Sequence, residues 1–382
     1  SDRATAVFSN LPIGKYTVDI EFKDSTTGVV LAEAKRPIEI GGSAANLNFS
    51  EEEYDYPDND DDKYSNLDEL RVEKNPADPS DLPIPHRMFI TSIDGQGDLS
   101  QWEGAGGHIG LLAGDAICAS LAQNAGLSGE YRAWLSDEQN DAYCRVAGGS
   151  GKKGSNTCNL NPEETKAYIS TGGKAVAESL DQPVEKGQMF HTIQFDEMGR
   201  DRINQDLYAW TGTNKKGEFL PEYGNCAGWT STDPSIEGGF GKGETVTKQW
   251  TDSFKASCGG TSSAGLYCFQ VSPADNVLPT YKVRSAKKVF LSSVKGTGDL
   301  STWPEANGQS GELAGDAICQ TLASNAGYAN ANKYVAWLSG TSVSAIDRLV
   351  GEGPWARLDG VLVAKNRADL LDGSLLTGIA QT

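Results

Sequence analysis

One heptapeptide, Leu-Ala-Gly-Asp-Ala-Ile-Cys, occurs twice in this chain and constrains its fold more than any other feature. The copies span Leu112–Cys118 and Leu313–Cys319. A matching stretch precedes each copy, beginning at Phe89 in the first and at Phe290 in the second, with the same spacing to the heptapeptide. Constant spacing indicates one structural module used twice. We therefore expect repeated binding or spacing modules rather than two active sites.

The repeated segment predicts a helix, followed by strands. Apolar Ile117, Leu121 and Ala125 share one helical face, and Gly126 fits a helix terminator. Asp115 is interpreted as an early-turn acid that interacts with the helix dipole. Strands are expected at residues 131–136, 186–193, 206–212 and 265–271, and in the second copy at 334–339.

The first 50 residues alternate between polar and apolar in the manner of β-strands. Tyr16, Val18, Ile20 and Phe22 share one face, and turns rich in Gly, Ser and Thr separate the expected strands. The pattern predicts a β-sandwich of the immunoglobulin or fibronectin type, whole or in part.

An acidic segment follows and has the spacing of an EF-hand-type calcium loop. Its candidate ligands are Asp58, Asp60, Asp62, the backbone carbonyl of Tyr64, Asn66 and Glu69. Calcium prefers six to eight oxygen ligands, and this alternation turns successive carboxylates toward one point. The alternative is an acidic, solvated linker that binds no ion.

Two features separate this segment from a paired EF-hand. Lys63 stands where glycine usually permits a sharp turn, and no apolar helix precedes the loop. The segment instead resembles the calcium loops of dockerin and thrombospondin type-3 repeats, and Asp78 and Asp81 farther along add to that resemblance. With a short helix at Asn66–Lys74, the expected role is to stiffen a junction between domains.

Composition excludes several partners. The net charge of −19 repels nucleic acid and other polyanions and suits an extracellular protein that binds cations. The alternative is that the charge serves solubility alone. No apolar run reaches the roughly 18 residues that a membrane helix needs. The chain has no initiating Met and no export signal, so we expect that any such signal was removed or not included.

The seven cysteines favour disulfides over a metal site. Paired CxxC spacings are absent, which argues against zinc. Six cysteines fall in the first repeat, and three disulfides there imply an oxidising compartment. Cys319, the counterpart of Cys118, is left without a partner in this chain.

The expected domain organisation follows from these boundaries. It comprises a β-sandwich at 1–50, an acidic calcium-binding linker at 51–87, a first module at 88–271, a linker at 272–288 and an incomplete second module at 289–382.

An ordered series of segments carries a family resemblance. The series comprises the helix with Cys118, then Tyr131–Ser136, Phe195–Asp201, Tyr208–Thr213, Asn225–Ser231 and Leu266–Gln270, with Gly353–Gly373 in the second copy. It resembles the endostatin domain at the end of certain collagens. It is still more similar to a bacterial domain of unassigned function in surface lipoproteins of spirochaetes and other bacteria.

The resemblance implies an α+β fold related to C-type lectins. It also implies nested disulfides Cys118–Cys268 and Cys226–Cys258. Cys144 and Cys158 lie outside that pattern and close together, so we expect them to form an additional disulfide.

Two family properties are not carried over. Heparin binding would need an arginine cluster that this acidic chain lacks. Zinc would need a histidine group, whereas His86, His108 and His191 are scattered.

No catalytic residues are predicted. GxSxG, HExxH and Walker A patterns are absent, and the glycine-rich residues 148–155 have the wrong spacing for a phosphate loop. Glycosidase activity remains an alternative because of the acidic pairs Asp196/Glu197 and Asp369/Asp372. Sequence cannot give the separation of the carboxylates in space, which decides that chemistry. Trp134 and Trp337 are expected in cores. Core packing is also favoured over sugar stacking for three further tryptophans, Trp210, Trp229 and Trp250.

These observations predict a non-catalytic protein, secreted or on the cell surface, that adheres to or binds a glycan or protein ligand. The alternative is a self-associating protomer of an extracellular filament or sheath, in which a neighbour completes the second module. Fewer residues follow Cys319 than separate Cys118 from Cys268. Either the chain is a fragment, which we favour, or another chain completes this module.

Overall fold

The computed structural model divides the chain into two compact units, residues 1–284 and 285–382. The boundary falls within the segment 272–288 that the sequence marks as a linker. The structure describes residues 6–42, 47–49, 54–158, 167–203, 207–219, 221–271, 286–328 and 330–379.

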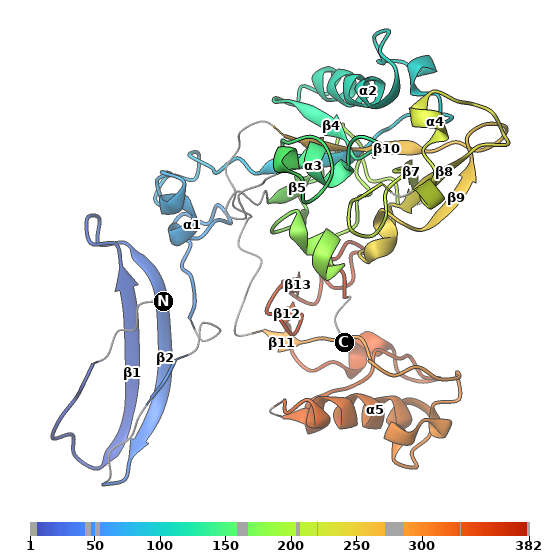
Figure 1. The fold of residues 1–382 in the computed structure, drawn as a ribbon. Helices are drawn as coiled ribbons and strands as arrows, with labels where there is room; N and C mark the ends of the chain where they lie inside the picture. Colours follow the sequence, from blue (N-terminus) through green and yellow to red (C-terminus); the bar gives the residue numbers. More distant parts are fainter. Residues whose placement is uncertain are drawn as a thin grey trace. The chain divides into compact units, whose positions relative to one another are not determined.

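The first unit begins with a long antiparallel hairpin, drawn in blue in Figure 1. Strand β1 (Gly14–Lys23) pairs with β2 (Val30–Ile40). The expected strands at these positions are confirmed, but the expected two-sheet sandwich is not, because only these two strands form among the described residues up to 49. The alternating residues Tyr16, Val18 and Ile20 are consequently half-buried rather than covered by a second sheet.

An eight-stranded sheet forms the centre of the first module. Its order is β6-β5-β3-β10-β7-β8-β9, and β4 also pairs with β10. The strands are β3 (His86–Ile90), β4 (Tyr131–Ala133), β5 (Tyr168–Ser170), β6 (Ala175–Ala177), β7 (Tyr208–Trp210), β8 (Glu237–Lys242), β9 (Phe254–Ser257) and β10 (Gly265–Gln270).

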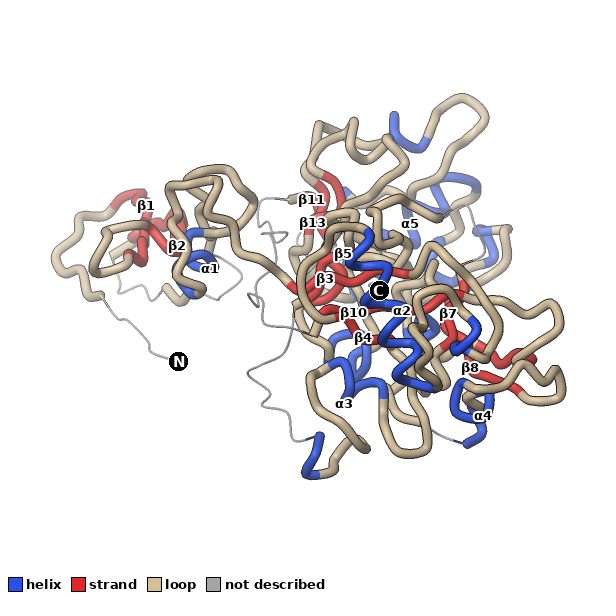
Figure 2. Tube along the Cα trace, turned by 90° about the horizontal axis from the view of Figure 1, so that it is seen from above, coloured by secondary structure: helices blue, strands red, loops and turns tan. Residues whose placement is uncertain are grey.

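Strand β10 divides the core because its side chains alternate between two faces. Leu266 and Cys268 pack with helix α2 (Gly110–Asn124), which lies beside β4 and β10 in Figures 1 and 2. Tyr267 and Phe269 face the other way, into a second buried cluster that contains Trp134. The mixed α+β character follows from one long helix covering one face of this sheet.

Short helices complete the first module. They are α3 (Ala142–Val146) and α4 (Cys226–Trp229), the 3-10 turns Leu99–Gln101, Asn156–Cys158, Pro221–Tyr223 and Lys248–Trp250, and a π turn at Gln182–Lys186. The expected strand at 186–193 does not form. Instead of a strand ladder, that segment makes an isolated bridge between Gln188 and Thr247 and single backbone hydrogen bonds from Met189 to Val246 and from Phe190 to Val176.

Three disulfides hold the first module together. They join Cys118 to Cys268, Cys144 to Cys158 and Cys226 to Cys258, the pairs expected above. The first links helix α2 to the middle of strand β10 across 150 residues of sequence.

The second unit repeats part of this arrangement. Helix α5 (Gly311–Asn325) corresponds to α2, and β11 (Lys287–Lys288), β12 (Trp355–Ala356) and β13 (Leu362–Ala364) form a three-stranded sheet. Short 3-10 turns lie at Leu300–Thr302, Pro304–Ala306, Ala331–Lys333 and Ala345–Arg348. The expected strand at 334–339 is not formed, and Cys319 is a free thiol.

Candidate metal centre

The acidic loop that precedes helix α1 (Asn66–Arg71) is anchored at both ends. Ser65 caps the helix, since its side chain accepts a hydrogen bond from the backbone N of Asp68. Asp55 forms a backbone bridge with Glu33 of strand β2. The loop therefore joins the N-terminal hairpin to a short, capped helix.

In each of three aspartates of this loop, one carboxylate oxygen accepts a backbone hydrogen bond and the other accepts none. Asp58 accepts from the backbone N of Lys63 at 2.9 Å through one oxygen. Asp60 accepts from the N of Asp62 at 3.3 Å, and Asp62 accepts from the N of Tyr64 at 2.8 Å. The other oxygen of each aspartate is buried and has no hydrogen-bond partner. The three carboxylates lie together, with ligand oxygens within 4.8 Å of one another.

Glu69 lies near this group from the first turn of α1. Its side chain is fully buried, and neither carboxylate oxygen has a hydrogen-bond partner. Burial, followed by the charges of Asp62, Asp60 and Asp58, raises the pKa of Glu69 to about 7. Such a carboxylate is costly to bury without a compensating cation.

The same causes act on Asp62. Burial raises the pKa of its carboxyl, and the charges of Asp60 and Asp58 add to that effect, against the hydrogen bond from Tyr64. Like charges gathered in a partly buried loop repel one another, and a cation held between them would reduce that repulsion.

These donors fit a hard cation of the calcium type. The three aspartate oxygens form the group within 4.8 Å, and Glu69 lies outside that group. The two Glu69 oxygens and the expected Tyr64 carbonyl are further candidate ligands. Sulfur and imidazole ligands, which suit zinc, take no part. Among the described residues, Asp58, Asp60 and Asp62 are the one group of His, Cys, Asp or Glu with metal-binding proximity.

Asn66 is used differently from the expected ligand. Its side-chain oxygen accepts from the backbone N of Asn59 at 3.0 Å, and its amide donates to the carbonyl of Val30 at 2.8 Å. The buried Asn66 side chain thus holds the loop on strand β2. The acidic spacing gave no signal for this role.

Lys63 takes the sharp turn that glycine usually takes. Its φ of 85° lies in the left-handed region, where a side chain is strained. The unusual residue is accommodated at a cost in backbone energy, and the turn expected of this loop still forms.

The acids that follow the loop are paired internally. Asp78 accepts from the backbone N and hydroxyl of Ser80, and Asp81 forms an ion pair with Lys74 at 3.1 Å. Their hydrogen bonds stabilise the turn after α1.

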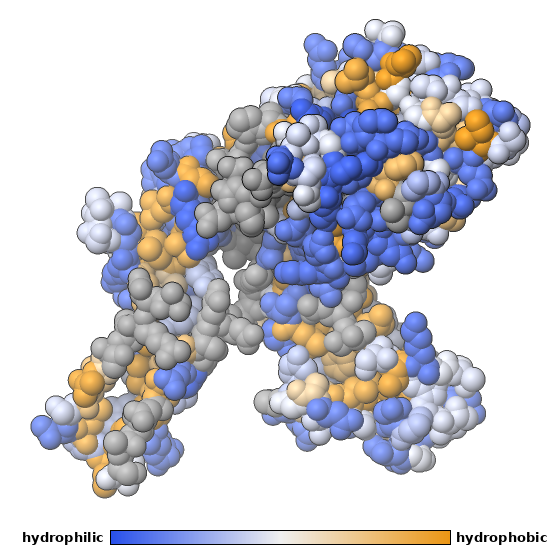
Figure 3. Space-filling model, in the orientation of Figure 1, coloured by the Kyte–Doolittle hydropathy of each residue, from blue (hydrophilic) through white to orange (hydrophobic). Residues whose placement is uncertain are grey.

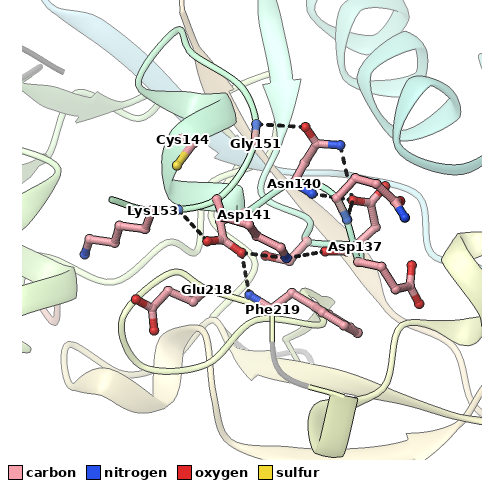
Figure 4. Close-up of polar contacts among 12 residues, drawn as sticks. Asp137, Asn140, Asp141, Cys144, Gly151, Lys153, Glu218 and Phe219 are labelled. Atoms are coloured by element: carbon pink, nitrogen blue, oxygen red, sulfur yellow. Dashed lines mark hydrogen bonds and ion pairs between the residues drawn. The ribbon is translucent and has the colours of Figure 1, made fainter. Parts of the chain in front are cut away.

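The two lysines of the glycine-rich residues 148–155 lie beside acidic residues of the same module. Figure 4 shows the buried carboxylate of Asp141 accepting hydrogen bonds from the backbone N of Lys153 and of Phe219, both at 2.8 Å. The ammonium group of Lys152 also contacts Asp141, and that of Lys153 contacts Glu185. Both lysine charges are therefore taken up by acids of the module itself.

A polar hollow of about 520 Å³ lies beside the disulfide Cys226–Cys258. It is lined by residues that include Glu222, Asn225, Ile236, Glu237, Lys255 and Ser257. Residues 226–229 all have positive φ, between 51° and 70°. Strained backbone of this kind often occurs at binding sites, and no local pattern in the sequence indicates it.

The tryptophans expected in the core are found there in the first module. Trp210, Trp229 and Trp250 are at most 1% exposed, so none offers a stacking surface.

The three histidines differ in environment: His86 is buried, His191 is half-buried and His108 is exposed.

Among the described residues, no helix has both the length and the apolar character needed to cross a bilayer. The chain matches no protein-family model and no curated protein.

Proposed function

We propose that this chain is a non-catalytic extracellular protein that binds calcium at the loop Asp58–Glu69 and adheres to a glycan or protein ligand through its modules. The observation that carries the calcium site is the set of buried carboxylate oxygens without partners, three from aspartates and two from Glu69. A bound cation would neutralise these charges and fix the loop against strand β2.

Three disulfides support the extracellular assignment, because such bonds persist in oxidising compartments. The long helix α2 on one face of the sheet and the nested pairs Cys118–Cys268 and Cys226–Cys258 support an endostatin-like, lectin-like module. The polar hollow beside Cys226–Cys258 is the candidate ligand site, because it combines carboxylate, amide and ammonium groups in one concave surface.

Calcium titration of the chelator-treated full chain tests the metal site. We expect a Kd of about 10⁻⁴ M, the range of extracellular calcium modules. Glu69→Gln keeps the side-chain shape but removes the charge, and should weaken binding roughly tenfold or more. Asp78→Asn, outside the loop, should bind as the unchanged protein does. Equal binding heats for Glu69→Gln and the unchanged protein would contradict the site.

A glycan array and a cell-binding assay test adhesion. Lys255→Ala removes an exposed charge from the hollow and should abolish the signal. Lys242→Ala removes a comparable partly exposed charge elsewhere on the same sheet and should leave the signal intact. Identical loss in both variants would place the ligand outside the hollow.

The second candidate is a protomer of an extracellular assembly. It is favoured by the exposure of Trp337, whose counterpart Trp134 is buried in the first module. Polymers that survive dilution in sedimentation experiments would favour this candidate, and a monomer that binds a glycan would favour adhesion.

A further inference from the structure

Asn66 connects the acidic loop to the N-terminal hairpin through one side chain. Its amide group donates to the carbonyl of Val30 in β2 at 2.8 Å, and its side-chain oxygen accepts from the backbone N of Asn59 at 3.0 Å. Its backbone N donates to the carbonyl of Pro57 at 2.8 Å. Because Asn66 is fully buried, each of these hydrogen bonds is costly to lose.

The residue that Asn66 holds lies between two candidate ligands. Asn59 stands between Asp58 and Asp60 in the sequence, and Glu69 lies in the same first turn of α1 as Asn66. The hydrogen bond from the backbone N of Asn59 therefore fixes the chain at the point where two carboxylates turn toward the cation site. Asn66 has the spacing expected of a ligand, but it holds the ligand-bearing backbone instead.

The hairpin meets the same acidic segment at two further points. Asp55 and Glu33 of β2 exchange backbone hydrogen bonds at 2.7 and 2.9 Å. The rings of Phe22 in β1 and Tyr54 pack edge to face, with 5.4 Å between their centres. Figure 3 shows apolar residues, in orange, at the surface of both the hairpin and the acidic segment. Both strands of the hairpin therefore contact the chain that leads into the loop.

The hairpin is most buried where it meets this segment. Both of its strands are described in full, and Ala32 and Ala34 are their two buried residues. These alanines flank Glu33, which forms the bridge with Asp55. The other residues of the two strands are half-buried or exposed. Order in the loop and burial in the hairpin are therefore found at one contact.

We propose that Asn66 is a positioning residue through which the calcium site and the β1–β2 hairpin stabilise each other. The inference rests on the calcium site proposed above and adds what that site regulates. Without a cation the gathered carboxylates repel one another, and the loop relaxes by giving up the hydrogen bonds of Asn66. With a cation the loop keeps the conformation that presents the Asn66 amide to Val30. Because linkage between binding free energies is reciprocal, an ordered hairpin in turn strengthens calcium binding.

Hydrogen exchange of the full chain, followed by mass spectrometry with and without calcium, tests this linkage. Calcium should slow exchange of the amides of β1 and β2 by at least about fivefold. In Asn66→Ala, calcium should still slow exchange within the loop, but its effect on the hairpin should fall below about twofold. A purely structural role of Asn66 would speed exchange of the hairpin by the same factor in both conditions, and that result would overturn the proposal.

A second pair of variants leaves Asn66 and the ligands unchanged. Phe22→Ala removes the ring that contacts Tyr54, whereas Ile13→Ala shortens a side chain before β1 that is 76% exposed. By reciprocity, Phe22→Ala should raise the Kd for calcium at least about threefold in calorimetric titration, and Ile13→Ala should leave it unchanged. Equal dissociation constants for the two variants would contradict the linkage.

These measurements separate the linkage from the calcium site itself. If the unchanged protein binds calcium but its hairpin exchanges at the same rate with and without the ion, the linkage is wrong and the site stands. If titration of the unchanged protein shows no calcium uptake, the site is wrong and the linkage falls with it.

Discussion

At the scale of single residues, backbone conformation and burial set how stable the acidic loop Asp58–Glu69 is without a cation. Lys63 adopts a φ of 85° at the turn of the loop, and Glu69 is buried without a hydrogen-bond partner. Both residues are unfavourable by themselves, because one strains the backbone and the other buries charge. Both become understandable if the loop is completed by a cation.

Replacing Lys63 with glycine should stabilise the calcium-loaded loop. Glycine adopts positive φ without a Cβ clash, so we expect a gain of about 1 kcal/mol in the free energy of unfolding. Chemical denaturation with calcium measures it. Lys63→Ala removes the same charge but keeps the Cβ, so it should give no comparable gain. If alanine and glycine stabilise equally, charge rather than backbone strain is responsible.

Replacing Glu69 with glutamine should have opposite effects with and without calcium. Without calcium the variant should be more stable by about 1 kcal/mol, because a buried charge without a partner becomes neutral. With calcium it should be less stable than the unchanged protein, because a ligand charge is lost. Thermal unfolding in chelator and in excess calcium measures the change in stability that Glu69→Gln causes in each condition. A change in the same direction in both conditions would argue against the metal site.

At the scale of elements, the repeated helix makes a long-range ion pair that its own sequence does not indicate. The sequence predicted α2, its apolar face and its end at Gly126 correctly, since these depend on local periodicity and on a φ of 72° at that glycine. It assigned Asp115 to the helix dipole. The structure pairs Asp115 with the buried Arg145 at 2.5 Å. An arginine 30 residues away leaves no local trace in the sequence.

The second copy repeats this ion pair, which gives a matched experiment. Asp316 and Arg348 are 2.6 Å apart, and Arg348 also donates to the carbonyls of Ala336 and Leu338. Asp115→Asn should destabilise the first module by about 3 kcal/mol, because it leaves the buried guanidinium of Arg145 without its partner charge. Asp316→Asn should destabilise the second module less, because Arg348 is only partly buried. In calorimetry of the full chain, each variant should lower the temperature of a different unfolding transition. Lowering of the same transition by both would mean that the modules unfold together.

Strands were predicted less well than helices, and the repeat shows why. Residues 131–136 and 334–339 have nearly the same sequence, yet only the first contains a strand, because β10 is present to pair with it. The local residue preference favours a strand in both copies, but a strand forms only where a neighbouring strand is present to pair with it. The predicted N-terminal sandwich is wrong for the same reason, since within the described residues up to 49 no second sheet covers β1 and β2. The grouping of Asp58, Asp60 and Asp62 could be predicted from sequence because these residues lie close together along the chain.

The two tryptophans of the repeat should differ in their contribution to stability. Trp134→Ala should cost about 3–5 kcal/mol, because it empties a fully buried site among Trp250 and Phe269. Trp337→Ala should cost less than about 1 kcal/mol, because that side chain is half exposed. Denaturant unfolding of both variants measures the difference. Similar costs would show that Trp337 is covered in solution.

At the scale of the whole molecule, the two units depend on disulfides to different degrees. All three bonds lie in the first unit, and the second has only the free Cys319. The Cys118–Cys268 bond closes 150 residues and should contribute about 5 kcal/mol in the loop-entropy account. A reducing agent should therefore lower the unfolding temperature of the first unit and leave that of the second unchanged. A shift of both transitions would indicate that the units stabilise each other.

The position of β10 also sets an order of events during synthesis of the chain. This strand is the last of the first module in sequence but lies in the middle of its sheet, and Gln270 reaches back across 183 residues to Arg87. A ribosome delivers β3, α2 and β4 long before it delivers β10. Until then Cys118 remains a thiol beside an open edge. The nascent first module must therefore pass through a stage in which β3, α2 and β4 are in place and the central position of the sheet is still open, so its Cys118–Cys268 bond can form only after the last strand arrives.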